Sequence, residues 1–157
     1  MKTRCLLLTL IALLTAGVCN AQGTKGTKFT DFKTEYNGKV QHLSDYVGKG
    51  QHVLAVFWAS WCPPCRKEIP HMIEIHNKYK DKNFTVLGIP TNDKPENSQK
   101  IIAQMEVPYP QLLNAQAAGA MAYGINSIPY LILFSPDGTI IARGNTIENL
   151  EELLSKL

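Results

Sequence analysis

The hydrophobic residues of this chain form two nearly uninterrupted runs in its first half, and a helical pattern follows each of them. The runs within residues 51–59 and 84–90 are typical of strands buried in the middle of a sheet. Between them, apolar side chains recur at helical spacing over residues 62–80, and a second helix is expected at residues 93–107. The order strand, helix, strand, helix predicts parallel strands joined by a crossover helix.

Sequence signals for the ends of helices refine this prediction. Asp93 and Glu96 have capping-box spacing, and Pro95 would lie in the first turn of the second helix. A short helix at residues 115–123 should end at Gly124. The face of the first helix that we expect to be buried consists of Ile69, Met72, Ile73, His76 and Tyr79.

The last third of the chain predicts a second kind of strand pairing. Strands are expected at residues 130–134 and 139–143, and the Ser-Pro-Asp-Gly sequence between them is a strong turn signal. Two strands joined so closely must be antiparallel. Asn145 and Glu148 then have the spacing that caps a final helix.

The chain also predicts a hairpin before the first buried strand. Short strands at residues 29–34 and 39–43 flank Asn37-Gly38, which favours a tight turn. One helical turn is expected at residues 44–47, before Gly48. The fold class is therefore α/β, with a central mixed β-sheet flanked by helices and an N-terminal β-hairpin.

Residues 1–21 have the pattern of a signal peptide. Lys2 and Arg4 precede the apolar run 6–14, and small and polar residues follow. The run is short for a membrane span. We expect cleavage after Ala21 and hence an exported, periplasmic protein; the alternative is a lipoprotein anchored through a lipid on Cys19.

Composition after that cleavage limits the function. Residues 22–28 predict a linker, and residues 29–157 a single domain without internal repeats. Loss of Lys2 and Arg4 lowers the formal charge from +3 to +1, so nucleic acid is not expected as a partner. The mature chain keeps two cysteines that are close in sequence, which is unlike a scaffold stapled by disulfides.

Those two cysteines are the strongest chemical signal in the sequence. Cys62 and Cys65 follow a buried strand and begin a helix, where unpaired N–H groups and the helix dipole favour the thiolate form of Cys62. Cys65 is one turn further along the same side. Pro63 and Pro64 suit the first turn but remove two N–H donors, which argues weakly against a strong oxidant. The pattern predicts a thiol pair that forms and opens the disulfide Cys62–Cys65.

The main alternative for an isolated C-x-x-C is half of a zinc site. Zinc would need further Cys or His ligands, but no second C-x-x-C exists, and His71 and His76 come later in the predicted helix. We therefore expect no metal. A thiol pair carries the electrons itself, so no cofactor is expected either.

Three segments resemble the exported thioredoxin-like proteins of the TlpA/ResA type. They are residues 57–70 (FWASWCPPCRKEIP), residues 123–129 (YGINSIP) and the turn at residues 134–138 (FSPDG). The resemblance implies a thioredoxin fold over residues 29–157 and thiol–disulfide oxidoreductase activity.

The resemblance also implies roles for individual residues. Cys62 would be the attacking cysteine and Cys65 the resolving one. Pro129 would follow a cis peptide bond, and the backbone of Ile128 would pair with an extended segment of the substrate. Trp61, Pro63 and Pro64 would contribute to the surface that the substrate contacts.

Glu68 stands at the position, three residues after the second cysteine, where the ResA-like proteins that this segment resembles carry an acidic residue. It could accept the proton of Cys65 during resolution; the alternative is a solvated charge beside Arg66 and Lys67. Cytosolic thioredoxins instead carry an aspartate two residues before the tryptophan that matches Trp58. Val56 stands at that position here, which favours the functional interpretation of Glu68.

The sequence thus predicts an exported enzyme that exchanges disulfides with protein thiols, in the direction of reduction, and draws electrons from a membrane-bound donor. A thiol peroxidase on the same fold is one alternative, although peroxiredoxins have a threonine where this chain has Ala59. A copper-binding chaperone is another, but such modules usually have three residues between their cysteines, not two.

Overall fold

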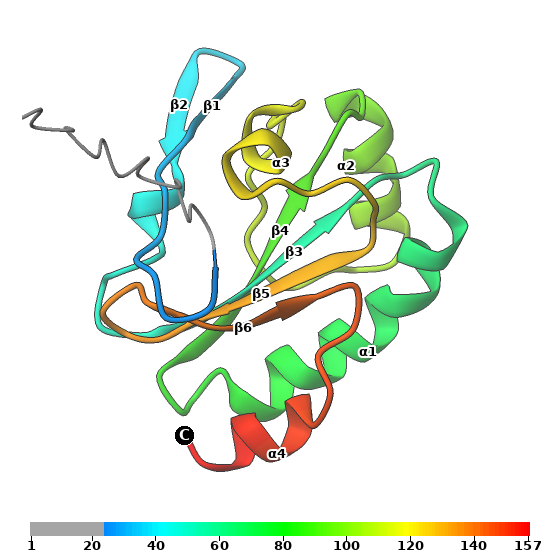
Figure 1. Cartoon of the computed structure of the whole chain (residues 1–157). Coiled ribbons are helices and arrows are strands. Elements are labelled where there is room, and N and C mark those ends of the chain that lie inside the picture. Colours follow the sequence, from blue (N-terminus) through cyan, green and yellow to red (C-terminus); the bar gives the residue numbers. More distant parts are fainter. Residues whose placement is uncertain (1–23) are drawn as a thin grey trace, which may run out of the picture.

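The computed structural model describes residues 24–157, so the predicted signal peptide and its cleavage site lie outside the described residues. A four-stranded sheet forms the centre of the fold (Figure 1). Its order is β4 (Phe84–Pro90), β3 (His52–Trp58), β5 (Tyr130–Phe134) and β6 (Ile140–Gly144). β3 is parallel to β4 and antiparallel to β5, which is antiparallel to β6. This is the mixed sheet that the sequence predicts.

Helices cover both faces of this sheet. On one face, α1 (Pro63–Tyr79) and α4 (Leu150–Ser155) pack against side chains such as Leu54, Val56 and Leu133. On the other face, α3 (Ala118–Tyr123) and the N-terminal segment bury the alternate residues of the same strands. α2 (Pro95–Gln104) packs near the end of β3, where Trp58 and Cys62 form a third cluster of buried residues. Since both faces are covered, the central strands β3 and β5 are apolar along nearly their whole length.

The N-terminal hairpin forms a separate two-stranded sheet, β1 (Lys33–Tyr36) and β2 (Lys39–His42) (Figure 1). Asn37 and Gly38 have φ angles of 51° and 73°, as a tight hairpin turn requires. A single 3-10 turn, Leu43–Asp45, follows at nearly the predicted place. The hairpin prediction is confirmed, with the first strand beginning later than expected.

The end of the predicted linker is hydrogen-bonded to the domain. The Gly26 N–H donates to the Ile140 carbonyl at 2.8 Å, and the Ile140 N–H donates to the Thr27 carbonyl at the same distance. Lys28 forms an isolated bridge with Thr139. The exposed edge of β6 thus offers backbone partners to residues 26–28 that sequence composition does not reveal.

The buried face of α1 differs in part from the prediction. Ile69, Met72 and Tyr79 are buried as expected, but Ile75 is buried as well, and Ile73 and His76 are only partly buried. The ring of His76 accepts a hydrogen bond from the Val86 N–H at 3.4 Å, and burial lowers the pKa of His76. His76 is therefore a packing residue, and its surroundings favour the neutral ring.

Both capping predictions for the later helices are wrong. α2 begins after Lys94, and no side chain caps it; Asp93 binds the loop before Cys62 instead. α4 begins after Asn149, again without a side-chain cap, while the side chain of Asn145 binds Pro129. In each case, a polar side chain suited to a cap instead forms a hydrogen bond with a segment distant in sequence.

Across residues 24–157, the helices fall short of the length and apolar character that a membrane span requires.

Candidate active site

The two cysteines lie where β3 leads into α1. Cys62 is the N-cap residue of α1, and Pro63 and Pro64 occupy its first turn. Cys62 and Cys65 are joined by a disulfide, with their Cα atoms 5.3 Å apart. The first free N–H of the helix, that of Cys65, donates to Cys62 Sγ at 3.3 Å. Because the two prolines have no N–H, this amide is the first that can stabilise a thiolate on Cys62, as the sequence predicts.

The disulfide is nearly covered. Cys62 is 5% exposed and Cys65 is 2% exposed, within a cluster that includes Trp58 and Ile69. A disulfide so close to the surface can be reached at its Cys62 end by a partner that fits the surrounding surface. The more deeply buried Cys65 is placed to act on Cys62 from inside the protein.

A loop before β5 faces Cys62. The Ile128–Pro129 peptide bond is cis, as expected from the resemblance. Cys62 Sγ lies 3.8 Å from the Ile128 carbonyl oxygen, to which a reduced thiol can donate. In the described part of the chain, the N–H and C=O of Ile128 make no hydrogen bond to another backbone group. Apart from this contact with Cys62, a backbone edge without a backbone partner therefore lies next to the sulfur.

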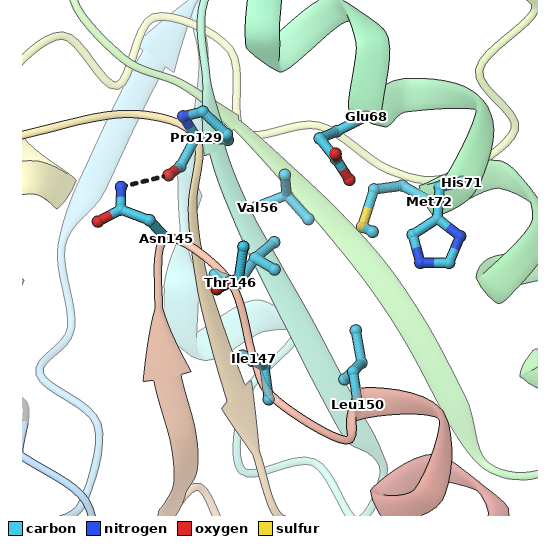
Figure 2. A pocket seen from close by; sticks show the side chains of 10 residues that line it. Val56, Glu68, His71, Met72, Pro129, Asn145, Thr146, Ile147 and Leu150 are labelled. Carbon is cyan, nitrogen blue, oxygen red and sulfur yellow. Dashed lines mark hydrogen bonds between the residues drawn. The ribbon is translucent and has the colours of Figure 1, made fainter.

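Glu68 lines a pocket beside this loop. Figure 2 shows the side chains of Glu68 and Met72 extending from α1 toward a space bounded by Pro129 and Val56. The pocket has a volume of about 130 Å³. Within residues 24–157, the carboxylate of Glu68 has no hydrogen-bond or ion-pair partner. The carboxylate of Glu68 is therefore not held in an ion pair where it lines this pocket.

Trp61 is the most exposed aromatic residue near the disulfide, with an exposed fraction of 61%. Its indole N–H donates to the Asn92 carbonyl at 3.0 Å, so the ring is held while its face remains open. Trp61 and Ile128 line a second pocket, of about 120 Å³, on this side of the disulfide. A large apolar surface that is both held and exposed is suited to contact with a partner.

Asp93 holds the loop that leads to Cys62, a role that the sequence did not indicate. Its buried carboxylate accepts hydrogen bonds from the Ser60 N–H at 2.6 Å and the Ser60 hydroxyl at 2.8 Å. It also accepts from the Ser98 hydroxyl at 2.7 Å. These charge-assisted bonds fix the chain two residues before Cys62.

Asn145 is a second residue whose role sequence reasoning missed. It comes from the loop after β6, and its amide reaches the carbonyl of Pro129 (Figure 2). The position of Asn145 directly after a predicted strand was the available signal, but the same position also suits a helix cap.

No cluster of three or more His, Cys, Asp or Glu side chains suited to a metal ion occurs in residues 24–157. Ala59 is fully buried three residues before Cys62 and has no hydroxyl group to offer there.

Comparison with known proteins agrees with the chemistry of this site. Residues 25–143 match the model of the AhpC/TSA family. The thiol-disulfide oxidoreductase ResA of Bacillus thuringiensis subsp. konkukian is 32% identical over 127 residues, which cover 79% of this chain and 72% of that protein. A crystal structure of the thioredoxin domain of a thiol-disulfide oxidoreductase from Bacteroides vulgatus is 28% identical, with a TM-score of 0.72, and the match covers 85% of this chain and 96% of that one. A thiol-disulfide oxidoreductase from Bacteroides fragilis has the same identity and TM-score, with 83% and 98% covered.

Proposed function

The chain belongs to the AhpC/TSA family and is a thiol–disulfide oxidoreductase of thioredoxin fold, and from this premise we propose that it is an exported reductant of protein disulfides. The observation that carries the proposal is the pairing of Cys62, at the start of α1, with the free backbone edge of Ile128. An extended protein segment can pair with that edge and present its disulfide to Cys62. A disulfide without peptide groups could not pair with such an edge.

The two cysteines carry all the electrons of the proposed reaction. The Cys62 thiolate attacks one sulfur of the substrate disulfide, which forms a mixed disulfide and releases the other substrate sulfur as a thiolate. Cys65 loses its proton and attacks Cys62 Sγ, which releases the second substrate sulfur. The substrate gains two electrons and leaves as two thiolates, which become thiols with the proton given up by Cys65 and one proton from the solvent; the enzyme is left with the Cys62–Cys65 disulfide.

The carboxylate of Glu68 is proposed to receive the Cys65 proton. Cys65 is buried, so its proton cannot pass freely to bulk water, whereas Glu68 is exposed, unpaired and on the next turn of α1. A proton acceptor within reach of the sulfur, or of one bridging water, accelerates such a step. Trp61, Pro63, Pro64, Ile128 and Pro129 are proposed to contact the substrate.

The direction of exchange can be tested by the reduction potential. With Pro63 and Pro64 in the first turn, the Cys62 thiolate is stabilised by fewer N–H groups, so the reduced form should gain little stability. We expect a potential near that of thioredoxin, about −270 mV, measured by equilibration with thiol buffers, together with reduction of insulin by the dithiothreitol-reduced protein. A potential near roughly −120 mV, that of a strong oxidant, would contradict the proposal.

We propose that the protein is exported, on the basis of the signal-peptide pattern in residues 1–21, and that a membrane-bound donor supplies its electrons. The Lys2, Arg4 and apolar 6–14 pattern supports cleavage after Ala21. We expect the intact mass of the secreted protein to correspond to a chain beginning at Gln22. A mass corresponding to a lipid-modified chain beginning at Cys19 would show instead that the protein is anchored.

A further inference from the structure

The pairing of β6 with β5 ends before it includes Ile128. The last pair in register is Leu131 with Gly144, and β6 ends at Gly144. A Cβ atom on Gly144 would lie 2.6 Å from the Thr146 carbonyl oxygen, so the chain turns sharply at this glycine. Residues 127–129 therefore extend beyond the ladder, without a neighbouring strand on this side to hold them.

Where the ladder of backbone hydrogen bonds ends, the side chain of Asn145 binds the loop instead. Its Nδ2 donates to the Pro129 carbonyl at 2.7 Å and lies 3.0 Å from the Ser127 hydroxyl oxygen. Nδ2 is also 3.5 Å from the Ser127 carbonyl, and Oδ1 is 3.4 Å from the Ser127 hydroxyl. One amide thus binds the residues on both sides of Ile128 and leaves Ile128 itself free (Figure 2 shows the bond to Pro129).

We propose that Asn145 is a positioning residue for disulfide exchange, which holds the backbone edge of Ile128 in the orientation that an incoming protein chain needs opposite Cys62. The inference rests on the proposed function, because only a substrate that pairs with this edge benefits from its orientation. Asn145 is exposed and belongs to no core cluster, so its contacts act on the loop that carries Ile128.

Two reactions distinguish a positioning role of Asn145 from a general structural role. Reduction of insulin by the reduced protein requires a polypeptide to dock at the Ile128 edge. Reduction of the Cys62–Cys65 disulfide by dithiothreitol requires no such docking. For Asn145→Ala, we expect kcat/KM for insulin to fall roughly fivefold, as for the loss of a hydrogen bond that holds reacting groups in place, with the dithiothreitol rate within about twofold of wild type.

Further variants identify the part of the amide that matters. Asn145→Asp keeps the shape but loses the donor to Pro129 and sets a carboxylate against its carbonyl, so it should be no better than Asn145→Ala. Ser127→Ala removes one partner only and should give a smaller loss. Asn97→Ala, on the exposed face of α2, is the matched control and should behave as wild type.

Wild-type insulin reduction by Asn145→Ala would overturn the inference. So would an equal fall in the insulin and dithiothreitol rates, because that result indicates a general structural effect; thermal unfolding of each variant checks for it. If the wild-type protein itself fails to reduce insulin while dithiothreitol reduces its disulfide, the proposed function fails, and the inference fails with it.

Discussion

Replacing Cys62 with alanine is expected to abolish catalysed reduction of insulin. The remaining rate should equal that of dithiothreitol alone. Cys62 is the N-cap residue of α1, its sulfur faces the Ile128 edge, and the Cys65 N–H is aimed at it. Cys65 is buried behind it and should not reach a substrate disulfide by itself. The measurement is turnover with dithiothreitol as the electron source, with circular dichroism to show that the variant is folded.

The complementary variant, Cys65→Ala, should fail at the second step and not the first. Cys62 can still attack, but the mixed disulfide has no internal thiol to resolve it. Covalent complexes should therefore accumulate on non-reducing gels, and mass spectrometry of those complexes would identify physiological partners. Labelling of the reduced wild-type protein by iodoacetamide at mildly acidic pH provides the check: modification of Cys65 before Cys62 would contradict these roles.

Glu68→Gln is expected to slow resolution about tenfold or more at neutral pH, the lower end of what a general base contributes. Glutamine keeps the shape of the side chain and removes its ability to accept a proton. The deficit should shrink as the pH rises, because hydroxide can then deprotonate Cys65 without a base. Single-turnover oxidation of the reduced protein by insulin, followed over a range of pH, measures both effects.

The matched control is Glu74→Gln, the same change on an exposed position further along α1. It alters the charge of the helix by the same amount but lies outside the pocket that Glu68 shares with Pro129. We expect wild-type rates from Glu74→Gln. Equal rates for Glu68→Gln and wild type would mean that Glu68 is a solvated charge and that the Cys65 proton leaves through water.

Much of the fold could be predicted from local sequence patterns. The strand Phe84–Pro90 and the strand Tyr130–Phe134 begin and end where the sequence predicts, since apolar runs bounded by turn residues indicate buried strands directly. The turn at Asn37-Gly38 and the helix end at Gly124 were also predictable, because each needs a backbone conformation that few residues adopt readily. The C-x-x-C pattern after a strand placed Cys62 at the start of a helix for the same kind of local reason.

The residues that support the site could not be found in this way. Asp93 and Asn145 both have side chains that cap helices, and both stand near the start of one. In the folded protein, Asp93 binds Ser60, 33 residues earlier, and Asn145 binds Pro129, 16 residues earlier. A sequence pattern indicates what a side chain can bind, but not which partner the fold brings within reach.

The sequence by itself determined the order of strands and helices, the reactive cysteine pair and the class of reaction, because these depend on spacing along the chain. The tertiary structure alone decided which polar groups surround that pair. It placed the Ile128 edge 3.8 Å from Cys62 Sγ, left Glu68 unpaired at the pocket beside Pro129, and used Asp93 and Asn145 as supports instead of caps. A short polar side chain binds whichever partner gives the better hydrogen bond, and the packing of distant segments determines which partners are available.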